Sequence, residues 1–169
     1  MIVATTERTR LRWMQPTDAK FILRLLNEPS WLEQIGDKGV RNEQDATAYL
    51  ETGPCAMYQQ FGHGLNLVEQ RASAEPIGIC GLLRRPTLPH PDLGFALLPE
   101  YWGQGYAFEA ATATLAHAKQ SLGLRCVLAI ALPSNRPSIR LLERLDFVDR
   151  GLQDPDDAGT VLSLYEKSL

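Results

Sequence analysis

Residues 99–110, PEYWGQGYAFEA, hold the pattern that decides the fold. Gly103 and Gly105 flank one polar residue directly before a segment with the apolar spacing of a helix. Glycine is unfavourable in regular structure, so a pair at this spacing indicates a requirement of the backbone. We predict a strand over residues 91–99 and a helix from the glycine pair to about Gln120, which places the pair at a strand-to-helix turn.

Such a turn can hold an anion, because the first N–H groups of a helix lack partners and carry partial positive charge. No Lys or Arg occurs between Pro91 and His117, so a phosphate here would depend on backbone amides, assisted by distant basic residues. There is no P-loop motif, and Phe108 replaces the third glycine of a dinucleotide-binding motif. The alternative is a glycine turn that only lets the helix pack on its strand.

The composition indicates one folded domain, assigned to residues 1–169, with 44% apolar and 22% charged residues. The net charge of −3 argues against nucleic acid held through its phosphates. The three cysteines lack the spacing of a zinc site or a disulfide framework, so we expect no metal. No signal-like start and no long apolar stretch is seen, so we expect a cytoplasmic protein without membrane association.

The pattern outside the turn predicts an α/β (α+β) fold, in which helices cover a mixed, mostly antiparallel sheet. Pro29 is expected to end the first helix, and Gly53-Pro54 to interrupt the second. Strands are predicted over 8–14, 64–70, 75–85, 91–99, 125–132, 147–153 and 160–167. Helices are predicted within 15–29, with Thr17 or Asp18 as the cap, over 41–51, over 105–120 and from 136 onward. A further short helix is expected around residues 31–35.

The glycine pair resembles the acyl-CoA signature of the GCN5-related N-acetyltransferase (GNAT) family, commonly written [QR]-x-x-G-x-[GA]. Gly103 and Gly105 match its last positions, and Glu100 stands where Gln or Arg is usual. The stretch YWGQGYAFEA is similar to the branch of that family that includes the ribosomal-protein N-terminal acetyltransferases. The order of predicted strands and helices also agrees, so the resemblance covers nearly the whole chain.

A second family motif, N-x-x-[AS]-x-x-x-[YLV]-x-x-x-G-F, is matched 30 residues further on. Asn135, Ser138, Leu142 and Phe147 fall at the matching positions. Asp146 replaces the usual glycine, where the backbone is often left-handed, a conformation that aspartate tolerates better than most residues. Two motifs in the correct order imply the GNAT-like fold and the coenzyme, and they do not identify the acceptor.

The resemblance implies transfer of an acetyl group from acetyl-CoA to a primary amine, by direct attack in a ternary complex. The diphosphate would lie on the backbone amides from Gly103 to Ala107, and the pantetheine arm between strands 92–98 and 125–132. A backbone N–H near Leu97 would stabilise the oxyanion that forms on the thioester carbonyl. The implied coenzyme-binding residues are Phe95, Ala96, Leu97, Trp102, Gly103, Gln104, Gly105, Tyr106, Ala107, Asn135 and Ser138.

Catalysis requires a neutral amine, so a base must accept a proton directly or through water. Asp92 is the candidate base and His90 a second candidate. Leu142 occupies the position where many relatives carry a tyrosine acid, which leaves Ser138 as the next hydroxyl near the departing thiolate. Serine is a poor acid, so its role would be a hydrogen bond to the sulfur or the arm. Alternatively, Ser138 is a small residue that admits the coenzyme, and Asn135 an ordinary helix cap.

The acceptor site is expected to come from the N-terminal helices, with Trp31, Glu33, Asp37 and Tyr58 as candidates. The acidic residues among them would favour a cationic acceptor: a peptide N-terminus, or a small-molecule amine such as a polyamine or an aminoglycoside. The alternative function is a module that binds acyl-CoA as a sensor or scaffold without turning it over. The chain is expected to be a monomer or a homodimer.

Overall fold

One eight-stranded sheet runs through the protein in a computed structural model that describes residues 1–169. The strand order is β1-β2-β3-β4-β5-β6-β8-β7, and every neighbouring pair is antiparallel except β5 and β6. The strands are β1 (Ile2–Thr5), β2 (Thr9–Trp13), β3 (Leu65–Gln70), β4 (Pro76–Leu83), β5 (Asp92–Leu97), β6 (Cys126–Ala131), β7 (Val148–Leu152) and β8 (Ser163–Ser168). The predicted α/β fold with a mixed, mostly antiparallel sheet is confirmed.

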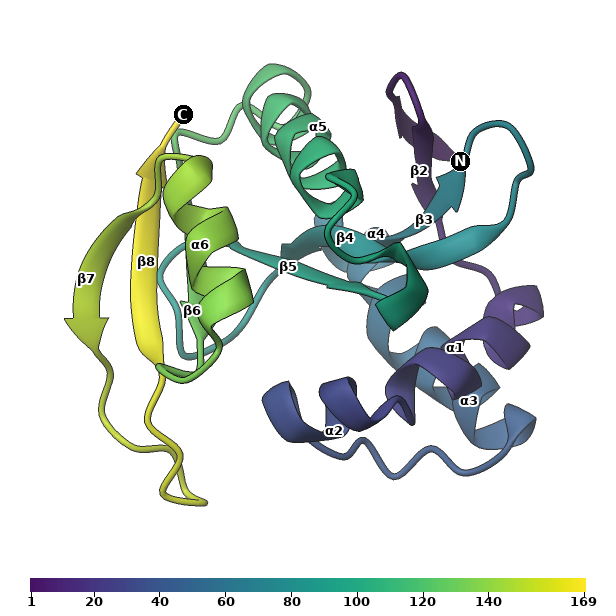
Figure 1. Ribbon diagram of the computed structural model, residues 1–169, viewed down its shortest axis with the longest axis horizontal. Helices are drawn as coiled ribbons and strands as arrows, with labels where there is room; N and C mark the ends of the chain where they lie inside the picture. The colour runs from purple at the N-terminus through teal and green to yellow at the C-terminus, as the bar shows by residue number, and fades with distance from the viewer.

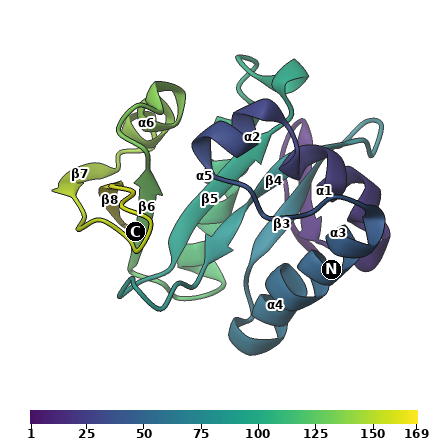
Figure 2. The same ribbon diagram turned by 90° about the horizontal axis from the view of Figure 1, so that it is seen from below.

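Helices cover both faces of this sheet (Figures 1 and 2). They are η1 (Pro16–Asp18), α1 (Ala19–Leu26), α2 (Pro29–Gln34), α3 (Glu43–Leu50), η2 (Glu51–Cys55), α4 (Ala56–Phe61), η3 (Pro99–Tyr101), α5 (Tyr106–Gln120) and α6 (Arg136–Arg144). One apolar cluster packs α5 and α6 against the sheet, and a second packs α1, α2 and α3 against the other face. None of the helices is both long enough and apolar enough to cross a bilayer.

Two predictions about proline were wrong. Pro29 does not end the first helix, which stops at Leu26; it occupies the first turn of α2. The first helical position tolerates proline because its N–H would have no partner there. Pro54 does not interrupt the second helical segment either. The chain passes from α3 through the π-helical turn η2, which contains Pro54, directly into α4, and the wider turn accommodates the missing N–H.

The N-terminal strand β1 was not predicted. It pairs with β2 across a two-stranded hairpin, with an irregularity between Ile2 and Ala4. A four-residue edge strand with a bulge does not show the regular alternation on which strand prediction depends. Asp146, by contrast, has φ of 61° as expected for a residue that replaces glycine after α6.

The parallel pair β5–β6 forms a fork. Asp92 and Leu128 are its one paired position, and the Leu128 N–H donates to the Pro91 carbonyl there. Beyond that point β5 continues along β4 while β6 continues along β8, so the two strands separate. In Figure 1 the opening lies between α6 and α2, with α5 above it. The fork leaves one edge of β5 without a neighbouring strand.

Candidate active site

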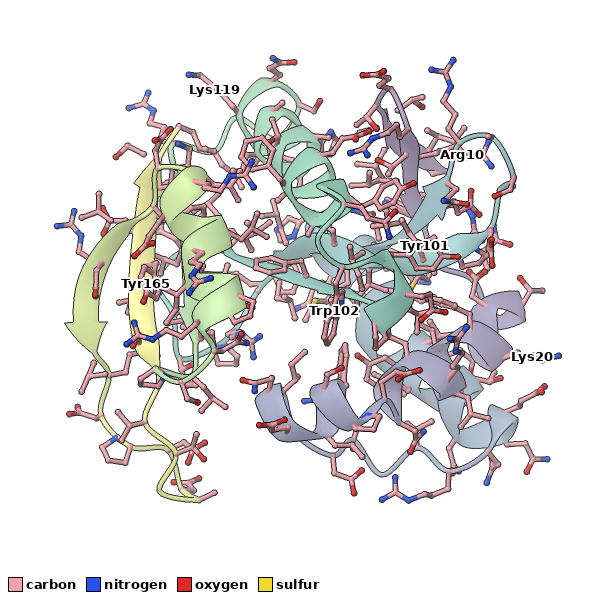
Figure 3. The ribbon with its side chains drawn as sticks, in the orientation of Figure 1. Arg10, Lys20, Tyr101, Trp102, Lys119 and Tyr165 are labelled. Carbon is pink, nitrogen blue, oxygen red and sulfur yellow. The ribbon has the colours of Figure 1, made fainter.

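A cavity of about 950 Å³ occupies the opening of the fork. It is lined by β5, the turn before α5, the end of β6, the start of α6, and α2. Trp102, which is 52% exposed, projects from the turn into this opening in Figure 3. Every coenzyme-binding residue predicted from the sequence lines the cavity except Gln104.

The glycine turn has the backbone that the sequence predicts. Gly103 and Gly105 have φ of 68° and 84°, in the left-handed region that favours glycine. None of the backbone N–H groups from Gly103 to Phe108 has a hydrogen-bond acceptor within the protein. These consecutive bare donors stand at the N-terminus of α5, where the helix dipole also favours an anion.

Arg8 and Glu109 hold this turn in place, and neither was predicted to do so. The Arg8 guanidinium donates to the Gln104 carbonyl over 2.9 Å and lies 4.6 Å above the Tyr106 ring. Glu109, in the first turn of α5, accepts from the Arg8 guanidinium over 2.7 Å and from the Arg8 N–H over 2.8 Å. Arg8 is a basic residue beside the turn, but its guanidinium contacts Glu109 and Gln104 and it does not line the cavity, so assistance to a phosphate by a distant basic residue stays a prediction. The turn itself lacks basic residues, so only the packing of the β1–β2 hairpin on α5 brings Arg8 there.

The open edge of β5 presents alternate backbone groups to the fork. The Leu98 N–H donates to Ile77 of β4, so by alternation the groups of Ala96 also face β4, and those of Phe95 and Leu97 face the fork. The Trp102 indole N–H donates to the Leu97 carbonyl over 2.8 Å. The Leu97 N–H and both Phe95 groups therefore stay available to a ligand. Ala96 lines the cavity without offering it backbone groups.

Asn135 caps α6, since its side-chain oxygen accepts from the Ser138 N–H over 3.3 Å. Both residues line the cavity, and the Ser138 hydroxyl makes no hydrogen bond within the protein. Leu142 lines the cavity one turn further along and is otherwise buried in the core. Asn135 therefore acts as the cap of α6, and because it also lines the cavity it can contact a ligand at the same time.

Asp92 lies at the closed end of the fork and is only 1% exposed. Both of its carboxylate oxygens lie 3.0 Å from the Arg85 Nε. Burial raises the pKa of Asp92 above its usual value, while the charge and hydrogen bond of Arg85 oppose that rise. His90, the second candidate base, is exposed and does not line the cavity.

The acceptor candidates separate into two groups. Trp31 and Glu33 line the cavity. Asp37 instead pairs with Arg41, and Tyr58 is buried away from the cavity, where its hydroxyl accepts from the Met14 N–H and donates to the Leu65 carbonyl. The prediction that Asp37 and Tyr58 line the acceptor site was wrong, because each side chain is used by the fold.

A bare helix N-terminus, an open strand edge and a buried carboxylate follow one another along the cavity. This arrangement suits a ligand with a diphosphate at one end, an extended amide-containing arm and a reactive thioester at the other end. Fold and site together define an acyl-CoA-dependent acyltransferase.

Comparison with known proteins gives the same class. Residues 8–148 match the family model described as the acetyltransferase (GNAT) domain. The chain belongs to the GNAT family and is an acetyl-CoA-dependent N-acetyltransferase. The predicted resemblance is therefore confirmed, and no comparison supports a module that only binds acyl-CoA.

Several relatives are similar over most of the chain. The uncharacterized N-acetyltransferase YnaD of Bacillus subtilis is 33% identical over 83% of this chain and 79% of its own. A GNAT-family acetyltransferase structure from Bordetella pertussis is 27% identical, covers 99% of both chains and has a TM-score of 0.79. The ribosomal L7/L12 α-N-protein acetyltransferase RimL, solved with coenzyme A, has a TM-score of 0.85 at 16% identity, covering 100% of this chain and 98% of its own. At that identity the likeness concerns the fold.

Proposed function

We propose that this enzyme transfers the acetyl group of acetyl-CoA directly to a primary amine, with both substrates bound in the fork between β5 and β6. The observation that carries the proposal is the run of bare N–H groups from Gly103 to Phe108, leading onto the free backbone groups of Phe95 and Leu97. The amides at the turn suit the coenzyme's diphosphate, and the edge of β5 suits its amide-containing arm.

Asp92 acts as the base in this proposal. A buried carboxylate with a raised pKa is a better proton acceptor than an exposed one, because its basicity lies closer to neutral pH. The amine nitrogen attacks the thioester carbon, its C–N bond forms as the C–S bond breaks, and its proton passes to Asp92 through a bridging water. The Leu97 N–H stabilises the charge that develops on the carbonyl oxygen.

Ser138 donates its free hydroxyl to the departing sulfur or to the pantetheine arm. The position of Leu142 in the core leaves no tyrosine hydroxyl at that point of the cavity. Since a thiolate is a tolerable leaving group and proximity supplies much of the acceleration, no strong acid is required. We expect Ser138 to contribute far less than Asp92.

The acceptor is a peptide or a small molecule that carries a primary amine. Structural neighbours described as ribosomal-protein acetyltransferases support a peptide N-terminus. A cytoplasmic location, a monomeric or homodimeric state and the absence of nucleic-acid and metal partners stay predictions.

The test is release of free thiol from acetyl-CoA in the presence of a panel of peptides and small amines, with the acetylated product verified by mass spectrometry. The Asp92→Asn variant should lose about 100- to 10,000-fold in kcat while its affinity for coenzyme A, measured by calorimetry, stays within twofold. His90→Gln is the matched control and should keep full activity. Full activity of Asp92→Asn at every pH would refute Asp92 as the base, and coenzyme binding without any acetylated product would refute the transferase function.

A further inference from the structure

Arg85 presents unused hydrogen-bond donors to the cavity. It lies in the loop between β4 and β5, its side chain is 40% exposed, and it lines the cavity beside Asp92. Only its Nε is used, on the two Asp92 oxygens. The two terminal nitrogens have no hydrogen-bond partner in the protein, so four of the five N–H donors of the guanidinium are free.

Tyr49 of α3 extends this polar surface. Its half-buried side chain packs against the apolar cluster beneath α1 and α3, Tyr49 is one of the residues that line the cavity, and its hydroxyl makes no hydrogen bond within the protein. Burial raises the pKa of Tyr49, with the charge of Arg85 opposing that rise, so the phenol is a neutral donor at neutral pH. Arg85 and Tyr49 therefore both line the cavity and both carry hydrogen-bond donors that the protein does not use.

The acidic groups around this end of the cavity are largely neutralised. Asp92 is paired with Arg85, and Glu28 lies 3.5 Å from Arg24. Among the carboxylates that line the cavity, only Glu33 has no ion-pair partner, and Lys38 lines the same region. The expected preference for a polyamine or an aminoglycoside therefore loses its basis, because such polycations need several free carboxylates.

We infer that the acceptor carries a carboxylate close to its reacting amine, and that Arg85 binds this carboxylate while Asp92 accepts the proton of the amine. The inference rests on the proposed function. Because one guanidinium contacts Asp92 and offers its remaining donors to the ligand, the carboxylate must lie within a few bonds of the amine. A planar guanidinium matches a carboxylate in a two-point contact, and Tyr49 supplies a further donor.

Two kinds of acceptor carry a carboxylate this close to a primary amine. One is the α-carboxylate of a free amino acid, and the other is the side-chain carboxylate of an N-terminal Asp or Glu in a peptide. Matched pairs of acceptors separate them: amino acids against their carboxamides, and peptide amides that begin with Asp or Glu against those that begin with Asn or Gln.

Steady-state kinetics on these pairs, with wild type, Arg85→Ala and Arg85→Lys, tests the inference. We expect wild type to prefer the carboxylate member of at least one pair, and Arg85→Ala to raise KM for that member by at least about tenfold, the value of one charged hydrogen bond. KM for the uncharged member should change by less than threefold. Arg85→Lys should recover part of the preference.

Arg84→Ala is the matched control, since Arg84 is the neighbouring arginine, donates to the Leu88 carbonyl and does not line the cavity. It should leave the preference intact. Equal effects of Arg85→Ala on both members of every pair, or a wild-type preference for the uncharged members, overturn the inference while acetylation itself continues.

If no amine is acetylated, the proposed function fails instead, and the inference is then decided by binding alone. Calorimetric titration of the N-acetyl amino acids and their carboxamides into the coenzyme A complex supplies this measurement. N-acetylated peptide amides that begin with Asp or Glu, against those that begin with Asn or Gln, are titrated in the same way. Tighter binding of the carboxylate member of either kind of pair that is lost in Arg85→Ala supports the inference, and equal binding in every pair overturns it.

Discussion

At the scale of single residues, the proposed chemistry depends on the pairing of Asp92 with Arg85. Asp92 is buried at the closed end of the fork, and Arg85 offsets part of the rise in its pKa that burial causes. If Asp92 is the base, as we propose, it must be ionised to accept a proton, so activity should fall as pH drops through the pKa of Asp92.

Arg85→Ala should move the acid limb of the kcat/KM profile to higher pH. The substitution removes the opposing charge and hydrogen bond, so burial then raises the pKa of Asp92 further. Arg85→Lys, which keeps the charge, should shift the limb less. The kcat/KM profile is the one to compare, because it reports the free enzyme and the free amine, and the free amine titrates identically with every variant. An unchanged acid limb would show that Asp92 is not the group that titrates.

The sequence predicted part of this site. Asp92 was predicted because it matches the acidic residue that many members of the GNAT family carry at the start of this strand, and the structure places it on the cavity. Arg85 was not found, because it lies in a proline-containing loop and its contact with Asp92 depends on how that loop folds back onto β5. Tyr49 was missed for a similar reason: on α3 it has the spacing of an ordinary apolar position, and only packing places it at the cavity.

At the scale of elements, the start of α5 and the start of α6 meet at the cavity that we assign to the coenzyme. Both were predicted with the correct residues, because glycine pairs and Asn-x-x-Ser caps are local signals. The π-helical turn through Pro54 and the bulged edge strand β1 were not, because each depends on tertiary contacts that override the local preference.

Gly103→Ala should weaken coenzyme A binding by at least about tenfold, because the added methyl group crowds the bare amides and loosens a charged hydrogen bond. Gly123→Ala is a matched control: φ is 65° against 68° at Gly103, and an added Cβ meets no atom within 4 Å at either position. Both variants should lose about 1 kcal/mol of unfolding free energy from the left-handed backbone. Calorimetry should show weaker binding of coenzyme A by Gly103→Ala than by Gly123→Ala. Equal affinities of the two variants would show that the glycine turn does not bind the coenzyme.

Asn135→Ala tests whether the cap of α6 also contacts the coenzyme. Asn42 caps α3 by the same contact, with its side chain accepting from the Asp45 N–H, and does not line the cavity. Each substitution should cost about 1 kcal/mol in urea unfolding. Only Asn135→Ala should also weaken coenzyme A binding, and a normal affinity would leave Asn135 with a purely structural role.

At the scale of the whole molecule, Glu109 connects the N-terminal hairpin to the helix that carries the glycine turn. Burial acts to raise its pKa, but hydrogen bonds from Thr6 and Arg8 outweigh that effect, so the pKa lies below its usual value of 4.5. A carboxylate with a lowered pKa stabilises the fold above its unfolded-state pKa, and this stabilisation is lost as pH falls through the folded-state value.

Glu109→Gln should therefore cost about 1–2 kcal/mol of unfolding free energy at pH 7, from the loss of charge-assisted hydrogen bonds. The difference in unfolding free energy between the variant and wild type should become smaller below about pH 4.5, where Glu109 of the wild type becomes protonated. Urea titrations at pH 7 and at acid pH give both values. If the difference in unfolding free energy does not change with pH, the stability lost in Glu109→Gln comes from packing and not from the charge of Glu109.

The exposed indole of Trp102 can also serve as an intrinsic fluorescent probe of coenzyme binding. Trp31, in α2, is buried on the acceptor side of the cavity, and Trp13 is stacked against Tyr58 with ring centroids 4.5 Å apart, so neither lies at the turn that we assign to the coenzyme. Trp102 borders the cavity and donates its N–H to a strand edge that we assign to the coenzyme arm. Arrival and departure of the coenzyme should be visible as a change in intrinsic fluorescence, which makes rapid-mixing measurements possible without attaching a dye.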